Sequence, residues 1–523
     1  MSAHDPHRRR FLRHAGGALG AAASASALPA WAAPALVASD AARPVPSGLQ
    51  FGDVGAQGAT VWARADRPSR LLVEVADDDS FRNARRLRGP LALPDADFTA
   101  RLDLPRPRGG EPRFVRVAFE TPGGGARSDW LHGRFRSAPL APRPVRLVWG
   151  GDVAGQGWGI NPDGGGMRIF DAMRARDPHF FLHSGDTIYA DGPIQAQVTA
   201  EDGLPWRNLV ADGVHKVAES LEEFRGRYRY NLRDPALRRF AAQVPQLWQW
   251  DDHEVVNNWS PGTDLRDDPR YTEKRIDVLA ARARRAFLEH SPQRIAGDPA
   301  RARIDRVLRY GPLLDVFVLD MRGYRAANGD NRQPREGADT AFLGARQLRA
   351  LARGLRASRA TWKVVAADMP LGLRISDKAP DGRRRWEAVA NGDDGPPLGR
   401  ELELARLLRA IRGVPNVVWL TADVHYCAAH HYDPSRAAFQ DFSPFWEFVA
   451  GPLNAGGFGA VPLDMTFGPT VVFQRTPPVQ NASPRSGYQF FGEVNIDPDA
   501  RTLTVDLRDI DGASVHTQVL QPA

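Results

Sequence analysis

The stretch FFLHSGDTIYAD, residues 180–191, decides how the rest of the chain is interpreted. An apolar run of strand character ends at Gly185-Asp186, and Tyr189 and Asp191 follow closely. A carboxylate and a phenol just past a strand end can hold a hard metal ion, and phenolate oxygen suits ferric iron better than zinc. A simpler interpretation is a strand followed by an aspartate turn with a half-buried tyrosine. This stretch alone leaves both interpretations open.

Similar apolar runs recur along the second part of the chain and alternate with helical segments. Four of them read VRLVWGGD, VPQLWQWDDHE, TWKVVAADMP and VVWLTADVHY. Near-continuous apolar strands are typical of a sheet buried on both faces. Residues 345–355 and 400–411 have helical spacing and lie between strands. The sequence therefore predicts a layered α/β domain.

An aspartate stands at the end of each of six apolar runs. Ligands of open α/β sheets bind at the carboxyl ends of the strands. Carboxylates gathered along one edge repel each other unless cations lie among them. One or two such residues are ordinary turn formers, whereas six favour a metal site. The six are Asp152, Asp186, Asp252, Asp320, Asp368 and Asp423.

Length and composition indicate a soluble protein of two domains. A chain of 523 residues is long for one domain, and its 42% hydrophobic and 25% charged residues are ordinary for a globular protein. The formal net charge is +7, and it falls to about +4 without the first 32 residues. Because the arginines are scattered, the sequence predicts no nucleic-acid recognition.

The N-terminus has the order of segments found in export signals. Arg8-Arg9-Arg10-Phe11-Leu12 resembles the twin-arginine signal, an alanine-rich stretch follows, and Ala30-Trp31-Ala32 offers a cleavage site. The alternative is a disordered basic tail. We expect residues 1–32 to be a signal peptide read by the twin-arginine export machinery, with the product periplasmic or extracellular. The stretch is too short and too rich in small residues for a stable membrane span.

Residues 46–138 predict a separate N-terminal domain. Short alternating segments with glycine and proline between them are typical of an antiparallel β-sandwich of fibronectin or immunoglobulin type. The proline-rich segment PLAPRP, residues 139–144, then forms a stiff linker. No catalytic cluster lies in this region, so its expected role is packing or spacing.

The polar motifs in their order resemble a known family. They are Asp152, GDTIY (185–189), WDDHE (250–254), LDMR (319–322) and ADVH (422–425). Together they resemble the PhoD-like alkaline phosphatases, a branch of the calcineurin-like metallophosphoesterases, over residues 46–519. The resemblance implies an α/β (α+β) four-layer metallophosphoesterase sandwich over residues 144–519, with the small all-β domain in front. It also implies a dinuclear metal site.

The resemblance assigns residues to that site. Asp186 would bridge the two metals, and Asp252 and Asp423 would bind the second. The first metal would be completed by Asp152, Tyr189 and His425. Phenolate, carboxylate and imidazole suit ferric iron, whereas oxygen donors alone suit calcium, so the expected pair is Fe³⁺ plus Ca²⁺.

One position departs from the family pattern. Many members carry a cysteine near the end of the first catalytic strand, where this chain reads Gly150-Gly151-Asp152. The wider superfamily's histidine partner would fall at Ala154, and Tyr189 would replace it. The identity of the metals therefore stays open. The single cysteine, Cys427, is expected to be a small buried hydrophobe, and one cysteine allows no intramolecular disulfide.

The implied mechanism is attack on a phosphate ester by a hydroxide held between two metals. His253 would donate a proton to the leaving group, or else only hydrogen-bond a nearby carboxylate. Arg322 would clamp the phosphate, or else form a salt bridge to Asp320. Asn258 is a further candidate for contact with the substrate.

Three functions remain open from the sequence. The leading one is a secreted metal-dependent alkaline phosphatase that hydrolyses small phosphate monoesters and some diesters. A phosphodiesterase or phospholipase D-type hydrolase on the same scaffold is the near alternative. A non-catalytic exported binding protein is the third, and the full set of candidate ligands argues against it because a decaying site loses ligands.

Overall fold

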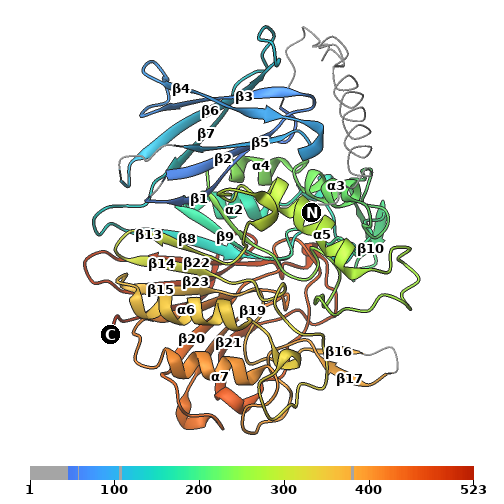
Figure 1. Cartoon of the computed structure of the whole chain (residues 1–523), viewed down its shortest axis with the longest axis vertical. Helices are drawn as coiled ribbons and strands as arrows, with labels where there is room; N and C mark the ends of the chain where they lie inside the picture. Colours follow the sequence, from blue (N-terminus) through green and yellow to red (C-terminus); the bar gives the residue numbers. More distant parts are fainter. Residues whose placement is uncertain (1–44, 57, 105–108, 379–381) are drawn as a thin grey trace, which may run out of the picture.

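The chain folds into four layers around two large mixed sheets (Figure 1). The computed structural model describes residues 45–523 except residue 57, residues 105–108 and residues 379–381, so the predicted signal peptide lies outside the described residues. The sheets lie face to face, and helices cover the outer face of each. This helix–sheet–sheet–helix order confirms the predicted α/β sandwich.

The nine-stranded sheet contains the strand of the FFLHS run. Its central strands β8 (Val145–Gly150), β9 (Phe180–Ser184) and β12 (Gln246–Gln249) pair parallel with one another. Their carboxyl ends therefore reach the same edge of the sheet. On the other side of β8, the sheet continues antiparallel through β22 (Phe490–Ile496), β23 (Leu503–Asp509) and β24 (Ser514–Leu520).

The seven-stranded sheet holds the later apolar runs. Its parallel strands are β14 (Leu314–Val318), β15 (Trp362–Ala366), β18 (Val417–Thr421) and β20 (Phe445–Val449). Antiparallel strands complete it: β13 (Arg306–Tyr310), β19 (Cys427–Tyr432) and β21 (Pro469–Arg475). Every residue of β14 and β15 is buried, as the near-continuous apolar runs predict for a covered sheet.

The main core fills the space between the two sheets. Leu147 and Leu182 of the nine-stranded sheet belong to the same apolar cluster as Val316 and Val364 of the seven-stranded sheet. Buried Trp149 also joins the sheets directly, because its indole Nε1 donates to the main-chain oxygen of Thr421 at 3.2 Å. This hydrogen bond connects the two sheets near the carboxyl ends of β8 and β18, where the polar loops begin.

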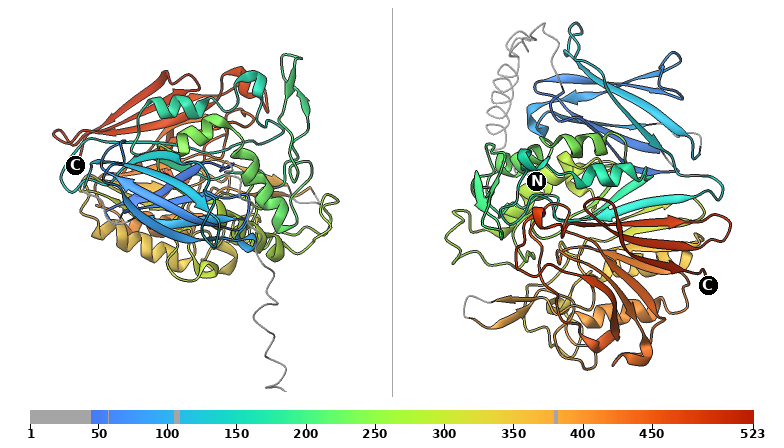
Figure 2. Two further views of the ribbon diagram at one scale, coloured as in Figure 1. Left: turned by 90° about the horizontal axis from the view of Figure 1, so that it is seen from above. Right: turned by 180° about the vertical axis from the view of Figure 1, so that it is seen from behind.

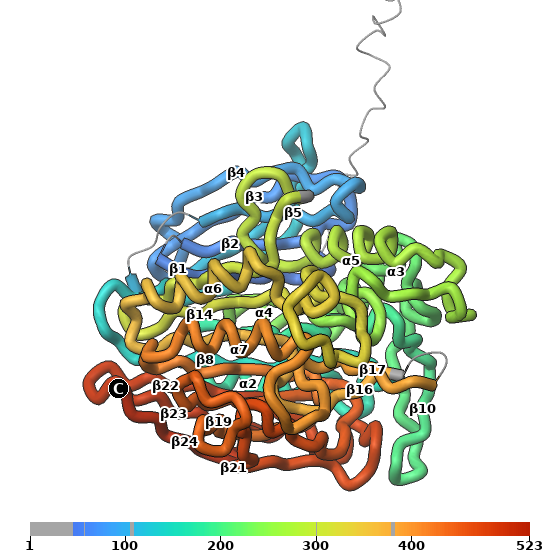
Figure 3. The backbone as a smooth tube through the Cα atoms, turned by 60° about the horizontal axis from the view of Figure 1, so that its bottom comes forward, coloured from blue at the N-terminus to red at the C-terminus, as the bar shows by residue number. Residues whose placement is uncertain are grey.

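Helices shield the outer faces. The nine-stranded sheet is covered by α2 (Ile169–Ala175), α3 (Leu221–Asn231), α4 (Pro235–Ala241) and α5 (Ile276–His290). The seven-stranded sheet is covered by α6 (Ala345–Ala357) and α7 (Glu401–Ala410), which lie side by side (Figure 3). Both agree with the predicted helices 345–355 and 400–411 to within two residues at each end.

The N-terminal strands form two facing sheets at one end of the molecule (Figure 2). A four-stranded sheet contains β3 (Ser69–Ala76), β4 (Arg85–Ala92), β6 (Pro112–Glu120) and β7 (Leu131–Arg136). Facing it are β1 (Leu49–Gly55), β2 (Gly58–Arg64) and β5 (Thr99–Leu104). Because β1 also pairs with β12, this second sheet is continuous with the nine-stranded sheet. The predicted domain boundaries stay a prediction.

Two short hairpins project from the layers: β10 (Gln197–Thr199) with β11 (Pro205–Arg207), and β16 (Ser376–Lys378) with β17 (Arg384–Trp386) (Figure 3). Short 3₁₀ helices occupy residues 94–96, 162–164, 299–301, 338–340, 434–436, 465–467 and 484–486. No helix in the described ranges combines the length and the apolar character that crossing a membrane requires.

Candidate metal centre

The loops after four central strands bring their aspartates together. Asp152 follows β8, Asp186 follows β9, Asp252 follows β12, and Asp423 follows β18 of the opposite sheet. Because the two sheets are packed face to face, these loops converge at one edge of the sandwich. All four side chains are buried or nearly so.

The ligand atoms form three overlapping groups, each within 4.8 Å. The first group contains Asp152, Asp186 and His425, and the phenol oxygen of Tyr189 lies 2.9 Å from His425 Nε2. The other two groups are Asp186, Asp252 and His253, and Asp251, Asp252 and Asp423. Asp186 is shared by the first two groups and Asp252 by the last two. The structure thus gathers every carboxylate, imidazole and phenol that the motifs nominate as metal ligands.

The backbone of these loops is strained. Asp152, Asp186, Asp423 and His425 have φ values of 70°, 49°, 69° and 59°. Residues other than glycine rarely adopt this left-handed region, and such strain concentrates at functional sites. Left-handed turns therefore set the direction of Asp152, Asp186 and Asp423 two residues after β8, β9 and β18, and that of His425 two residues before β19.

Electrostatics shows that this volume suits cations. Burial, together with the charges of neighbouring carboxylates, raises the pKa values of Asp152 and Asp186 well above the usual range, and burial raises that of Asp423 to about 8. Asp152 Oδ2 and Asp251 Oδ2 are buried without a hydrogen-bond donor. A bound cation would satisfy these oxygens and remove the repulsion, so the donor set fits metal ions.

Asp152, which stands near the position where many family members carry a cysteine, is closely packed. A Cβ atom on Gly451 would lie 2.2 Å from Asp152 Oδ2, so the loop after β20 approaches this carboxylate closely. Cys427 lies elsewhere, buried in the core on β19, as predicted. The aspartate, rather than a thiolate, therefore occupies this corner of the centre.

His253 is oriented by Asp191. Its Nδ1 lies 2.6 Å from Asp191 Oδ1, and its ring packs 4.2 Å from the ring of Tyr189. Burial lowers the pKa of His253, but the charges of Asp191, Asp252 and Asp186 outweigh this and raise it well above the ordinary value. The side chain is 13% exposed. The Asp191 contact leaves the other ring nitrogen free of that carboxylate, so the ring can still present a proton to a ligand.

Arg322 lies beneath the second part of the centre and is fully buried. Its Nε donates to Asp251 at 2.5 Å, and its Nη1 binds Glu387. Its Nη2 is buried without a hydrogen-bond acceptor and lies 3.8 Å from Asp252 and from Asp423. The alternative side-chain salt bridge to Asp320 is not formed, since Arg322 contacts that carboxylate only through its main-chain N–H. The phosphate contact stays a prediction.

Asn258 lies at the border of the centre. Its main-chain N–H donates to Asp252 Oδ2, and its side-chain Nδ2 donates to Asp377 Oδ1 at 3.1 Å. Two of the six strand-end aspartates lie outside the groups. Asp320 accepts from the Trp250 indole at 2.9 Å, and Asp368 lies 3.3 Å from Arg322 Nε. These two have structural partners rather than positions among the candidate ligands.

Two buried glutamates have roles that the sequence did not reveal. Glu254 accepts the main-chain N–H groups of Asp186, Thr187 and Asp251, so it ties the loop after β9 to the loop after β12. Glu254 belongs to the WDDHE motif, and its place beside the candidate ligand Asp252 was the feature of the sequence that could have revealed this role. Glu387 directly follows the short strand β17 and pairs with Arg322, but no apolar run precedes it in the sequence to mark it.

Comparisons with known proteins agree with this geometry. The sequence model of the PhoD-like phosphatase family matches residues 147–507, and that of its N-terminal domain matches residues 30–139. Alkaline phosphatase D of Bacillus subtilis (strain 168) is 29% identical over 296 residues, which are 53% of this chain and 46% of that protein. The match thus spans about half the length of that relative.

A solved structure described as the structure of PhoD has the same fold. It superposes with a TM-score of 0.68 at 19% identity, covering 93% of this chain and 90% of the other. At this identity the likeness concerns the fold.

Proposed function

Because the chain belongs to the PhoD-like phosphatase family, we propose that it is a metal-dependent phosphoric ester hydrolase, an alkaline phosphatase of the D type. The observation that carries the proposal is the series of three overlapping ligand groups with unpaired buried carboxylate oxygens. A structural acid cluster would have its oxygens satisfied by the protein. Here Asp152 Oδ2 and Asp251 Oδ2 have no hydrogen-bond donor, and both residues belong to the ligand groups, where bound cations would satisfy these oxygens.

The proposed cofactor is a pair of cations, Fe³⁺ with Ca²⁺. Asp186 would be shared between them, Asp252 and Asp423 would hold the second, and the first would be completed by Asp152, Tyr189 and His425. The phenol and imidazole of the first group suit ferric iron, and the carboxylates of the last group suit calcium. When bound, such cations neutralise phosphate charge and lower the pKa of water.

His253 is proposed to donate the proton that the leaving oxygen needs. Asp191 fixes the imidazole through Nδ1, so the proton available to a ligand is on Nε2. Burial lowers the pKa of His253, whereas the charge of Asp191 raises it and so favours the protonated ring that a general acid needs before the ester bond breaks. The alternative is that His253 only forms a structural hydrogen bond with Asp191. The dependence of the hydrolysis rate on the leaving group distinguishes this role from proton donation.

Arg322 is proposed to act through Nη2, the guanidinium nitrogen nearest the centre. Its distance of 3.8 Å from both Asp252 and Asp423 lets it hold these carboxylates apart and add positive charge under a bound phosphate. Its remaining nitrogens are already engaged by Asp251 and Glu387. Asn258 is proposed as a neighbouring contact on the substrate side.

The proposed substrates are small phosphate monoesters, with some activity on diesters. The purified protein should contain two metals per chain, show the visible absorption band of a tyrosinate–iron pair, and hydrolyse p-nitrophenyl phosphate faster than the bis(p-nitrophenyl) ester. A faster reaction with the bis ester would favour the phosphodiesterase or phospholipase D-type alternative. Absence of metal and of both activities would favour the exported binding protein.

Export is proposed to depend on residues 1–32. The Arg8-Arg9-Arg10 stretch and the small-residue site at Ala30-Trp31-Ala32 support it. The protein would then act in the periplasm or outside the cell, having folded with its metals before transport.

A further inference from the structure

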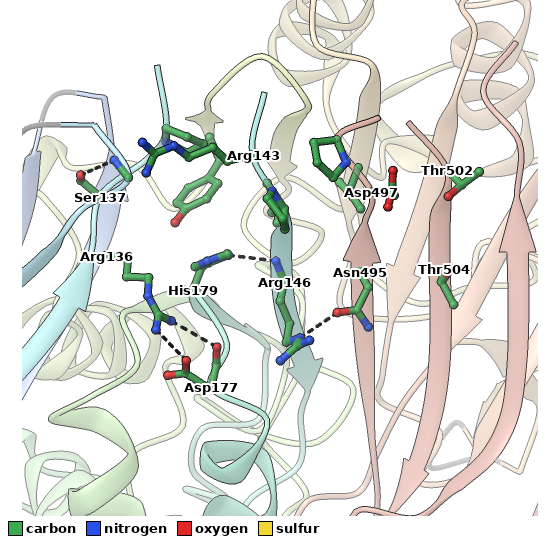
Figure 4. Close-up of a pocket in the computed structure, with 17 residues that line it drawn as sticks. Arg136, Ser137, Arg143, Arg146, Asp177, His179, Asn495, Asp497, Thr502 and Thr504 are labelled. Carbon is green, nitrogen blue, oxygen red and sulfur yellow. Dashed lines mark hydrogen bonds and ion pairs between the residues drawn. The ribbon is translucent and has the colours of Figure 1, made fainter. Parts of the chain in front are cut away.

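The organic part of a phosphate ester held at the metals has to be received by nearby loops. A cavity of about 700 Å³ at the junction of the linker with the nine-stranded sheet lies too far away (Figure 4). Arg146 lines this cavity at the start of β8, whereas Asp152 follows the end of that strand. A strand rises about 3.3 Å per residue, so the two places are about 20 Å apart. The arginines of the cavity are also already paired with carboxylates: Arg136 with Asp177, Arg143 with Glu111 and Arg146 with Glu493.

Phe458 has its aromatic ring beside the first ligand group. The centroid of this ring is 5.1 Å from that of the His425 imidazole, with an angle of 68° between the two planes. The side chain is partly exposed, and none of the apolar clusters in the described part of the chain includes it. Phenylalanine stabilises a fold mainly by burying its ring among apolar side chains. A ring that packs on a candidate metal ligand instead of the core is available to a bound substrate.

The loop that carries Phe458 fixes the position of this ring. The main-chain N–H of Phe458 donates to the main-chain oxygen of His425 at 3.1 Å, and His425 Nδ1 donates to the main-chain oxygen of Gly456 at 2.5 Å. Residues 456–459 read GGFG, and a Cβ atom on any of the three glycines would lie within 3.1 Å of a residue in the segment 477–481. The glycines thus allow that segment to pack closely against the loop. A ring held in place before binding loses little conformational freedom when a ligand reaches it.

Phe458 and His253 are the two ends of a series of ring contacts. The centroid distances are 4.2 Å from His253 to Tyr189, 6.2 Å from Tyr189 to His425 and 5.1 Å from His425 to Phe458. The proposed general acid, His253, faces the oxygen of the leaving group. The opposite end of the series is therefore beside a group that remains on phosphorus after the leaving group departs.

We propose that Phe458 contacts the second organic group of a phosphate diester, the one that stays on phosphorus, and favours an aryl group there. This inference rests on the proposed hydrolase function. Aromatic rings attract each other in offset or edge-to-face arrangements, beyond the effect of the area that they bury. A monoester has no second organic group, so Phe458 contributes nothing to its hydrolysis. Phe458 is thus a specificity-determining residue for aryl diesters.

The test uses three esters with the same leaving group: p-nitrophenyl phosphate, methyl p-nitrophenyl phosphate and bis(p-nitrophenyl) phosphate. Phe458→Ala should lower kcat/KM about tenfold for the bis ester and by less than about twofold for the other two, because only the bis ester keeps an aryl group on phosphorus. Phe458→Leu, which keeps an apolar side chain, should give a smaller loss on the bis ester alone. Metal content should stay at the level of the wild type in both variants.

Phe114→Ala is the matched control. Phe114 is also partly exposed and outside the apolar clusters of the described residues, but it lies on β6, in the four-stranded sheet of the N-terminal strands. This variant should leave kcat/KM unchanged for all three esters.

A binding measurement tests the same contact without hydrolysis. Diphenylphosphinate and dimethylphosphinate carry the same charge and have no ester bond. In calorimetric titrations of the metal-loaded protein, Phe458→Ala should weaken the binding of diphenylphosphinate about tenfold and leave that of dimethylphosphinate unchanged. An equal effect on both phosphinates would overturn the role of Phe458.

The outcomes also separate this inference from the proposed function. A wild-type protein that cleaves none of the three esters would overturn the hydrolase function itself. A wild-type protein that cleaves them, with the same ratio of bis ester to monoester in Phe458→Ala, would overturn only the role of Phe458. Equal losses on all three esters together with a loss of metal would overturn it as well, because Phe458 would then only support His425.

Discussion

At the scale of single residues, the centre depends on buried carboxylates that lie within a few ångströms of one another. Asp186 is the most central of them, because it belongs to two of the three ligand groups and its main-chain N–H is fixed by Glu254. Its position between the groups makes it the residue whose charge both cations would share. Single substitutions here should therefore act on metal content before they act on the fold.

Asp186→Asn should remove metal from both positions and reduce turnover more than 100-fold, beyond the 10–100-fold typical of residues that only support ligands. Metal content per chain and hydrolysis of p-nitrophenyl phosphate measure this. Asp264→Asn, an exposed aspartate on a loop, serves as the control and should change neither. Full metal content in Asp186→Asn would contradict the bridging role.

His253→Ala should lower turnover about 100-fold while leaving metal content nearly unchanged, which is the scale of general acid catalysis. The loss should be larger for an alkyl phosphate than for p-nitrophenyl phosphate, because p-nitrophenolate leaves without a proton. Asp191→Asn should show the same pattern more weakly, since it only orients the ring. Equal losses on both substrates would instead point to a structural role for His253.

At the scale of elements, the strand-to-loop turns determine the centre. Gly185 has a φ of 98°, and a Cβ atom there would lie 2.4 Å from the Cβ of Asp251. The turn after β9 therefore combines left-handed backbone with close packing against the loop after β12. Gly165 also has a positive φ, 84°, but meets nothing within 4 Å.

This contrast makes a matched pair of substitutions. Gly165→Ala should lower the free energy of unfolding by about 1 kcal/mol, the cost of left-handed backbone alone. Gly185→Ala should cost more and should also reduce metal content, because Asp251 and the neighbouring ligands must move. Chemical denaturation and metal analysis on both variants check this, and equal effects would show that close packing at Gly185 is unimportant.

At the scale of the whole molecule, the N-terminal strands are tied to the helical layer by one buried carboxylate. Asp97, in the connection between β4 and β5, binds Arg64 of β2, Arg229 of α3 and His290 of α5. Burial would raise the pKa of Asp97, but hydrogen bonds from His290 and Arg64 outweigh it and hold the pKa far below 3.8. The ionised form is therefore favoured in the folded protein.

The sign of the pH dependence follows from this depressed pKa. Asp97 contributes its full stabilisation above the unfolded value of 3.8, and this contribution is lost as the pH falls below it. Asp97→Asn should lower the free energy of unfolding at pH 7 by about 3 kcal/mol, as for a broken buried ion pair. It should also flatten the dependence of stability on pH below about 4, measured by denaturant titration. An unchanged acid slope would contradict the assignment.

Export is also a property of the whole chain. Replacing Arg8, Arg9 and Arg10 by lysine should leave the protein in the cytoplasmic fraction while its activity in extracts is retained, because none of the candidate ligands belongs to residues 1–32. Cell fractionation with an activity assay measures this. Normal appearance in the periplasm would exclude the twin-arginine route.

The layers and most of the candidate ligands follow from the pattern of residue types. Apolar runs ending in aspartate specify buried parallel strands, and the parallel direction sends their ends to one edge. The pattern therefore nominates Asp152, Asp186, Asp252 and Asp423, but it nominates Asp320 and Asp368 equally, and these two lie outside the ligand groups. Periodicity also locates α6 and α7. These features depend on local sequence or on strand direction, and for this reason the pattern of apolar and polar residues is enough to predict them.

Which distant side chains meet depends instead on the packing of the folded chain. The Asp191–His253 contact, the burial of Arg322 against Glu387, and the separation of Asp320 from the metal cluster depend on how loops pack across the sheets. The continuity of β1, β2 and β5 with the nine-stranded sheet arises in the same way. Such pairings join residues far apart in the chain, and their energies depend on distance and burial, which no local pattern of residue types records.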